Sequence, residues 1–213
     1  MKDFPVFPTD SGVSSLILRE IPYRQEAYIH IRDLQPGGLE EHLRECVSFC
    51  RMAGAERIYA TGSDALECCP HAMSLILMRG TAWVDQQKLC NLFPVTEATA
   101  SRWRSIYNER MKGVDTARTL ETKDEKTLPE SQCYFVHSNG NLLGIGWLED
   151  TKLLAVAATV PGAGERVMHT LMSLVEGADM TIEVASTNEK AIHLYEKLGF
   201  LKTQEITRWY RVL

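Results

Sequence analysis

The stretch NEKAIHLYEKLGF, residues 188–200, constrains the fold of this chain more than any other. Residues with small, apolar or aromatic side chains recur in it at the spacing of one helix face: Ala191, Leu194, Tyr195 and Leu198. Asn188 stands where a helix N-cap is expected, and Gly199 where a left-handed C-terminal cap falls. The stretch therefore predicts a short helix with an amide, a small residue and a phenol along one side.

The segment before this helix has the pattern strand, glycine turn, helix, strand. The apolar run Lys152–Val160 (KLLAVAATV) predicts a strand, Pro161–Gly164 a turn, Arg166–Val175 a helix and Met180–Ala185 a second strand. A helix between two strands predicts a parallel pair with a right-handed crossover. The free backbone N–H groups at the start of such a helix, near Gly164–Val167, form a natural site for a pyrophosphate.

Together these elements resemble the GNAT superfamily of acyl-CoA-dependent N-acyltransferases, over about Asn91 to Leu213. The resemblance implies an α/β (α+β) fold with a mixed, mostly antiparallel sheet, flanking helices and a splayed parallel strand pair. It also implies transfer of an acetyl group from acetyl-CoA (coenzyme A) to a primary amine of an unidentified acceptor by direct attack. Tyr195 would then be the general acid that protonates the CoA thiolate.

The cofactor-binding residues that the resemblance implies lie on the first strand, the turn and the last helix. They are Ala157, Ala158, Thr159, Val160, Gly162, Gly164, Glu165, Arg166, Val167, Asn188, Ala191 and Tyr195. The turn departs from the family pattern, because Arg166 stands where a second glycine is common and Met168 where a small residue is common. We therefore expect the phosphates to be held differently or more weakly than in the family.

A general base is harder to assign, because the strand Lys152–Val160 contains no acid. Glu149 and Asp150 lie just before it, and Glu183 lies on the neighbouring strand, so each is a candidate. The alternative for Glu149 and Asp150 is a solvated turn between two antiparallel strands. The alternative for Tyr195 is a core aromatic.

The composition is that of a globular protein: 213 residues, 45% hydrophobic and 24% charged, with a net charge of −5. The acidic balance argues against nucleic acid as a partner. No apolar run approaches the ~20 residues of a membrane span, and MKDFPVFPTD lacks the apolar stretch of a signal peptide. We expect a cytoplasmic protein without membrane contact, acting on a small-molecule or peptide amine; the oligomeric state is not predicted.

Six cysteines in such a protein are expected to be reduced thiols. His42, Cys46 and Cys50 would share one helix face, and Cys68 and Cys69 are adjacent. No closely spaced cysteine pair brackets a turn, as structural zinc sites usually require, so we predict no metal site. We expect these cysteines to be small buried hydrophobic residues instead.

The N-terminal third repeats the order strand, Pro-Gly turn, helix, Gly-Ala, strand between Tyr28 and Thr61. This predicts residues 1–85 to be a degenerate GNAT-like half and residues 86–213 the acetyltransferase domain, with Met78–Lys88 as the connection. Ser63–Pro70 replaces the asparagine-to-tyrosine helix, so we do not expect the first half to catalyse. A chance similarity of two βαβ units is the alternative.

Two further segments have local signals. Arg102–Lys112 reads as an amphipathic helix, and Asn139–Gly140 as a tight turn between two strands. Two functions other than catalysis stay open: a non-catalytic acyl-CoA-binding regulatory or sensor protein, and an interaction scaffold without cofactor.

Overall fold

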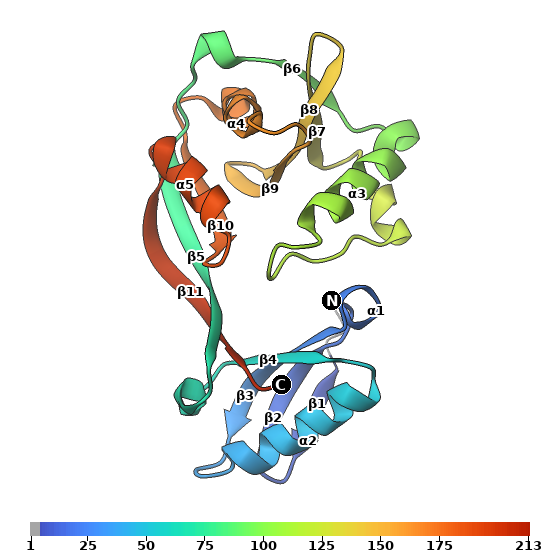
Figure 1. The fold of residues 1–213 in the computed structure, drawn as a ribbon, viewed down its shortest axis with the longest axis vertical. Coiled ribbons are helices and arrows are strands. Elements are labelled where there is room, and N and C mark those ends of the chain that lie inside the picture. The colour runs from blue at the N-terminus through green and yellow to red at the C-terminus, as the bar shows by residue number, and fades with distance from the viewer. Residues whose placement is uncertain (1–4) are drawn as a thin grey trace. The chain divides into compact units, whose positions relative to one another are not determined.

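A computed structural model describes residues 5–213 and shows a mixed α/β fold (Figure 1). Its strands form an 11-stranded sheet in the order β1-β2-β3-β4-β11-β5-β10-β9-β8-β7-β6. The chain divides into two compact units, one made of the residues up to Ser74 with Thr207–Leu213, the other of Leu75–Ile206. The predicted domains, 1–85 and 86–213, stay a prediction, and residues 1–4 lie outside the described part.

The first unit is a small sheet with one long helix on it. Its elements are β1 (Val6–Thr9), β2 (Gly12–Ile17), α1 (Ile21–Arg24), β3 (Glu26–Leu34), α2 (Leu39–Met52), β4 (Arg57–Thr61) and the 3₁₀ turn η1 (Asp64–Cys68). β3 and β4 are parallel neighbours joined through α2, as the sequence predicts for this segment. The last residues of β11 (Leu201–Arg211) pair with β4.

The second unit carries the predicted motif. Its strands are β5 (His71–Thr81), β6 (Asn91–Pro94), β7 (Gln132–Ser138), β8 (Asn141–Glu149), β9 (Lys152–Ala158), β10 (Asp179–Ala185) and most of β11. Its helices are α3 (Glu97–Met111), α4 (Gly164–Met172) and α5 (Glu189–Lys197), with the 3₁₀ turns η2 (Gln86–Lys88), η3 (Thr122–Lys126) and η4 (Ser173–Val175). The predicted order of strand, turn, helix, strand and helix is thus confirmed.

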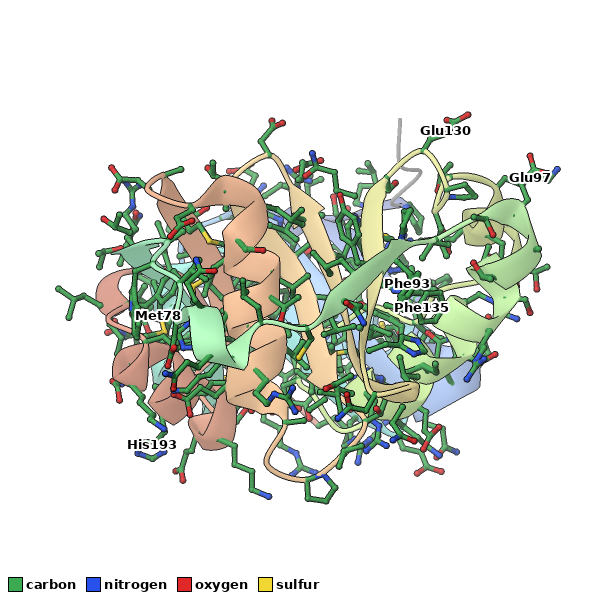
Figure 2. All side chains as sticks on the ribbon, turned by 90° about the horizontal axis from the view of Figure 1, so that it is seen from above. Met78, Phe93, Glu97, Glu130, Phe135 and His193 are labelled. Atoms are coloured by element: carbon green, nitrogen blue, oxygen red, sulfur yellow. The ribbon has the colours of Figure 1, made fainter. Side chains whose placement is uncertain are left out.

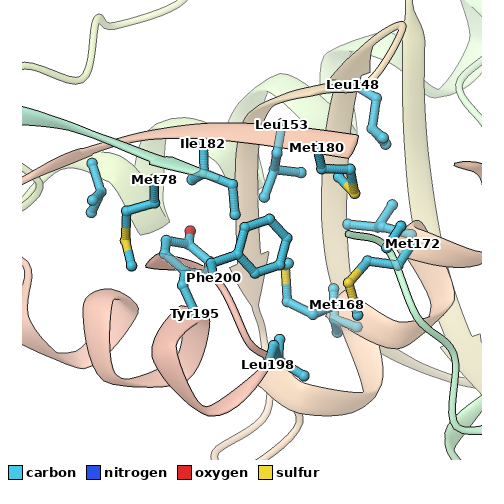
Figure 3. Packing of buried hydrophobic residues seen from close by; sticks show 14 of the residues in the cluster. Met78, Leu148, Leu153, Met168, Met172, Met180, Ile182, Tyr195, Leu198 and Phe200 are labelled. Carbon is cyan, nitrogen blue, oxygen red and sulfur yellow. The ribbon is translucent and has the colours of Figure 1, made fainter. Parts of the chain in front are cut away.

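Two apolar clusters hold the helices on opposite faces of this sheet. α4 and α5 pack on one face through Met168, Met172 and Tyr195, together with Phe200 at the start of the last strand (Figure 3). α3 packs on the other face through Trp103, whose indole N–H donates to the carbonyl oxygen of Tyr134 at 3.1 Å. Strands β8 and β9 therefore lie between two layers of helices.

The hairpin of β7 and β8 follows the predicted Asn139–Gly140 turn, with φ of 51° and 77° at these two residues. Positive φ at both central positions is what a two-residue hairpin needs. At the outer edge, β6 pairs with β7, and Phe93 lies directly beside Phe135 (Figure 2).

One prediction about connectivity is wrong. Met78–Lys88 is not a connection throughout, because β5 runs to Thr81 and its Met78 is fully buried. β5 is a central strand, paired with β10 over seven residues. Its central residues, 75–78, form an apolar run without polar alternation, which is why the strand was not recognised.

Candidate active site

The centre of the candidate site is the point where β9 and β10 separate. These parallel strands pair only at Lys152 with Thr181 and at Leu153 with Ile182. Beyond that point β9 keeps pairing with β8 up to Ala158, and β10 keeps pairing with β5 up to Ala185. The facing edges of the two strands thus diverge, and alternate N–H and C=O groups of β9 point toward the gap.

A β-bulge accounts for the separation. In the β8–β9 ladder Trp147 lies opposite Ala155 and Leu148 opposite Leu153, so Leu154 is an extra residue on β9. An extra residue bends the strand and increases its twist. The bulge follows immediately after the last β9–β10 pair, and it turns the rest of β9 away from β10. In the N-terminal unit, by contrast, β3 and β4 stay paired over five residues and leave no such gap.

The start of α4 lies directly after the turn that leaves β9. Ala163 is its N-cap and provides no side-chain hydrogen bond to the helix. The first intrahelical bond with a residue of this turn runs from the N–H of Val167 to the carbonyl oxygen of Ala163, at 3.0 Å. The N–H groups of residues 164–166 therefore have no intrahelical acceptor, which makes this end of the helix suitable for an anion.

Two glycines shape this turn. Gly162 has a φ of +79°, which favours glycine. Gly164 lies against α5, since a Cβ on it would come within 3.2 Å of a Leu194 methyl carbon. Gly162 and Gly164 thus shape the turn. Their contact with a cofactor stays a prediction.

Thr159 fixes the beginning of the turn. Its backbone N–H donates to Leu143 and its hydroxyl to Leu142, both at 2.8 Å, and its carbonyl oxygen accepts from Arg110 Nη2 at 3.0 Å. The side chain of this predicted cofactor residue is therefore used within the protein. Val160, the next residue, is exposed.

Glu165 and Arg166, both predicted to bind the cofactor, make internal contacts. The Glu165 carboxylate accepts from Lys88 Nζ at 2.5 Å and from Lys197 Nζ at 2.7 Å. Hydrogen bonds from Lys197 and Lys88 lower the pKa of Glu165 to about 2. The Arg166 guanidinium donates to the hydroxyl of Ser138 at 2.9 Å. The predicted Val167 is fully buried in the core, so only its backbone faces the helix start.

On α5, Asn188 and Tyr195 have different surroundings. Asn188 Oδ1 accepts from the N–H of Ala191 at 3.3 Å, which confirms Asn188 as the N-cap. The Tyr195 ring is only 6% exposed and packs edge-on against Phe200, with ring centroids 6.3 Å apart (Figure 3). Burial raises the pKa of Tyr195, so its hydroxyl is protonated at neutral pH.

The acidic candidates for the base have different surroundings. Glu183 is the first β10 residue beyond the parallel ladder, and its carboxylate accepts from Lys152 Nζ at 2.5 Å. Glu149 is exposed at the end of β8, and Asp150 adopts a φ of 53° in the turn to β9. The predicted solvated turn at Glu149 and Asp150 is thus confirmed, and Glu183 is the acid nearest to the separation point along the strands.

Glu183 and Tyr195 approach β10 from opposite faces. Successive side chains of a strand alternate between its two faces. Ile182 and Val184 pack in the same cluster as Tyr195, so Glu183 between them projects to the other side of the sheet. A carboxylate and a phenol thus lie on opposite faces of β10.

Two side-chain contacts hold the chain just beyond the ends of β9 and β10, and sequence patterns did not reveal them. Arg110 at the end of α3 holds Thr159 just beyond β9, and Asp115 accepts from the Thr187 hydroxyl, just beyond β10, at 2.6 Å. The partners are 49 and 72 residues apart in sequence, which no local pattern encodes.

No metal-binding group of three or more His, Cys, Asp or Glu residues is present in residues 5–213. His42 instead lies between two hydroxyls, with Nδ1 2.7 Å from Thr9 Oγ1 and Nε2 2.6 Å from Ser14 Oγ. Cys46 and Cys50 are buried beside it in the core of the first unit. No helix among the described residues is long and apolar enough to cross a membrane.

The sheet, whose central parallel strands separate at a bulge beside an uncapped helix start, belongs to a GNAT-like fold, and several solved structures are similar to it. A putative acetyltransferase from Pyrococcus horikoshii is 14% identical, with a TM-score of 0.57 over 95% of this chain and 69% of its own. A GCN5-related N-acetyltransferase from Anabaena variabilis is 9% identical, with a TM-score of 0.57 over 94% of this chain and 59% of its own.

A functionally unknown conserved protein from Staphylococcus epidermidis is 9% identical, with a TM-score of 0.58 over 98% of this chain and 93% of its own. No protein-family model matches this chain, and no curated protein sequence matches it significantly. At these identities the likeness concerns the fold. The chain has a GNAT-like fold.

Proposed function

We propose that this protein is an acyltransferase that moves an acetyl group from acetyl-CoA to a primary amine of a small-molecule or peptide acceptor. The observation that carries the proposal is the β9–β10 ladder, which ends after Leu153 and Ile182 beside the uncapped start of α4. An extended ligand arm pairs with an open strand edge as another strand would. The N–H groups of residues 164–166 are suited to its pyrophosphate.

The chain's own groups supply the elements of direct attack. When the acceptor nitrogen forms its bond to the thioester carbon, the carbonyl oxygen becomes an oxyanion, which a backbone N–H of β9 stabilises. The carbon–sulfur bond then breaks, and the departing thiolate takes a proton. Tyr195 is the proposed donor of that proton, because its hydroxyl is protonated at neutral pH and its ring packs in one cluster with Ile182 and Val184 of β10.

Removal of the proton from the acceptor amine is assigned to Glu183 rather than Glu149. Glu183 lies at the point of separation and is about one-third exposed, so it can reach the amine directly or through water. Glu149 lies beyond the ladder at the exposed end of β8. The ion pair with Lys152 keeps the Glu183 carboxylate oriented on the face opposite Tyr195.

A non-catalytic acyl-CoA sensor is the second candidate, and the start of α4 is what favours it. Arg166 is engaged with Ser138, and Met168 is fully buried where the family has a small residue. Helical geometry already begins at Gly164, so fewer backbone N–H groups are free for phosphates than a longer loop would give. Binding without turnover would fit this arrangement.

Thiol release separates the two candidates. Purified protein is incubated with acetyl-CoA and a panel of primary amines of differing charge and size, and free CoA is followed over time. Amine-dependent release with acetylated product supports the transferase. Saturable acetyl-CoA binding with no release for any amine supports the sensor, and absence of binding contradicts both.

A further inference from the structure

Lys88, Lys197 and His169 converge on the carboxylate of Glu165 in the first turn of α4. Lys88 belongs to η2, Lys197 to the last turn of α5 and His169 to the second turn of α4. The two lysines contact different carboxylate oxygens, Lys88 at Oε1 and Lys197 at Oε2. Each carboxylate oxygen therefore has its own cationic partner, and the partners come from two different elements.

A buried histidine lies next to the two lysines and Glu165. The His169 side chain is fully buried, and its Nδ1 accepts from the backbone N–H of Asp85 at 3.3 Å. The neutral ring then carries its proton on Nε2. Nε2 has no hydrogen-bond partner in the part of the chain that the structure describes, and it lies 4.0 Å from Glu165 Oε1. This N–H is thus near the carboxylate but makes no hydrogen bond to it.

The connection between β5 and β6 is fixed to the two helices around this cluster. The Trp83 indole N–H donates to the carbonyl oxygen of Leu198 at 2.9 Å, and the Trp83 ring packs edge-on against His169. The N–H of Cys90 donates to the hydroxyl of Thr170 at 3.1 Å. Lys88 therefore stands at a position defined by contacts on both sides of it.

We propose that Glu165 is an internal counter-anion: it neutralises a cationic site made by Lys88, Lys197 and the α4 N-terminus, and so weakens the binding of phosphate groups there. The proposal deepens the proposed function and rests on it for the identity of the phosphate ligand. Glu165 lies in the first turn of α4, so its carboxylate adds a negative charge close to the N–H groups of residues 164–166. Lys88 also pairs with Asp85 at 3.5 Å, so Glu165 is the carboxylate that the two lysines share.

The counter-anion affects only the binding of ligands that carry phosphates. Removing one negative charge close to a phosphate strengthens phosphate binding, and salt screens this gain over a Debye length of about 10 Å at 0.1 M ionic strength. A ligand without phosphate gains nothing. A role of Glu165 in structure alone predicts no such difference between ligands.

The test compares wild type, Glu165→Gln and the control Glu176→Gln by calorimetric titration. Glu176 is an exposed acid in the turn after η4, so its change lowers the net negative charge equally. The ligands are CoA, pantetheine, which lacks the phosphates, and inorganic pyrophosphate. We expect Glu165→Gln to bind CoA and pyrophosphate about three- to tenfold more tightly at low salt, with unchanged pantetheine binding and no effect of Glu176→Gln.

A second variant keeps the test decisive if Glu165→Gln does not fold. Lys197→Met removes a side chain that is 65% exposed and leaves Glu165 with one lysine, so pyrophosphate and CoA binding should weaken severalfold. Equal or weaker CoA and pyrophosphate binding by folded Glu165→Gln would overturn the proposal. If wild type bound neither CoA nor pantetheine, the proposed function would fail, while a gain of pyrophosphate binding in Glu165→Gln would still support the counter-anion.

Discussion

Lys152 and Glu183 form an ion pair at the end of the parallel ladder between β9 and β10, with Nζ 2.5 Å from Oε1. Both side chains are about one-third exposed, so the pair contributes at most ~1 kcal/mol to stability. If Glu183 is the base, Glu183→Gln should lower kcat about 100-fold and change the melting temperature little. Steady-state thiol release and thermal melting check this.

Glu149→Gln is the matched control for Glu183→Gln. It changes the same chemical group on the exposed end of β8, opposite Lys152 in the ladder. We expect its kcat to stay within about twofold of wild type, because a solvated side chain away from the gap has no proton to remove. If Glu149→Gln lowered kcat more than Glu183→Gln, Glu149 and not Glu183 would be the base.

Tyr195→Phe tests the proton donor without disturbing the core. The ring packs between α5 and the sheet, and phenylalanine keeps that packing. We expect turnover to fall about 100-fold while acetyl-CoA affinity and the melting temperature stay close to wild type. Retained turnover in Tyr195→Phe would show that this tyrosine serves only as a core aromatic.

Gly144→Ala should damage the strand that lines the gap. A Cβ at residue 144 would lie 2.5 Å from the carbonyl oxygen of Ala157 and 2.7 Å from Val167, so β9 and α4 would both have to shift. We expect a loss of about 1–3 kcal/mol in the free energy of unfolding and weaker acetyl-CoA binding. Gly113→Ala is the control, since no atom lies within 4 Å of its Cβ position, and it should be close to neutral.

His42 makes the N-terminal unit sensitive to mild acid. Burial lowers the pKa of His42 below its ordinary 6.5. Below pH 6.5, His42 therefore binds a proton in the unfolded chain more readily than in the folded chain. The contribution of neutral His42 to the free energy of unfolding is therefore fully present above pH 6.5. As the pH falls below this value, the free energy of unfolding decreases by up to ~1.4 kcal/mol per pH unit. His30, whose pKa burial also lowers, adds in the same direction.

Chemical denaturation between pH 7.5 and 5 measures this loss, and His42→Asn should reduce its slope. Staying above pH 5 avoids the contribution of Glu165, whose lowered pKa matters only as the pH falls from 4.5 toward about 2. The same slope in wild type and in folded His42→Asn would mean that other groups take up the proton.

The parts of the fold that are encoded locally could be predicted from the sequence. Asn188 caps α5, Gly199 ends it with a φ of 90°, and Asn139 with Gly140 closes the β7–β8 hairpin. Each of these depends on the conformational preference of one or two residues. The order of strand, turn, helix and strand from Lys152 to Ala185 could also be predicted, because each element has its own local run of apolar or turn-forming residues.

What the sequence did not reveal depends on contacts between distant residues. Lys88 and Glu165 are 77 residues apart, and only the path of the β5–β6 connection brings them together. The pairing of β5 with β10, and of β11 with β4, likewise joins segments that share no local pattern. For the candidate site this means that residue types were predicted, while the internal partners of Glu165, Arg166 and Thr159 were not.

Amide hydrogen exchange with and without CoA tests most directly that the gap beside β9 holds the cofactor. The account predicts that saturating CoA slows exchange in residues 154–160 and at the α4 start, residues 164–166, and leaves β3 and β4 of the N-terminal unit unchanged. Unchanged exchange along β9 and at the α4 start, at a CoA concentration that saturates any measured binding, would contradict the account.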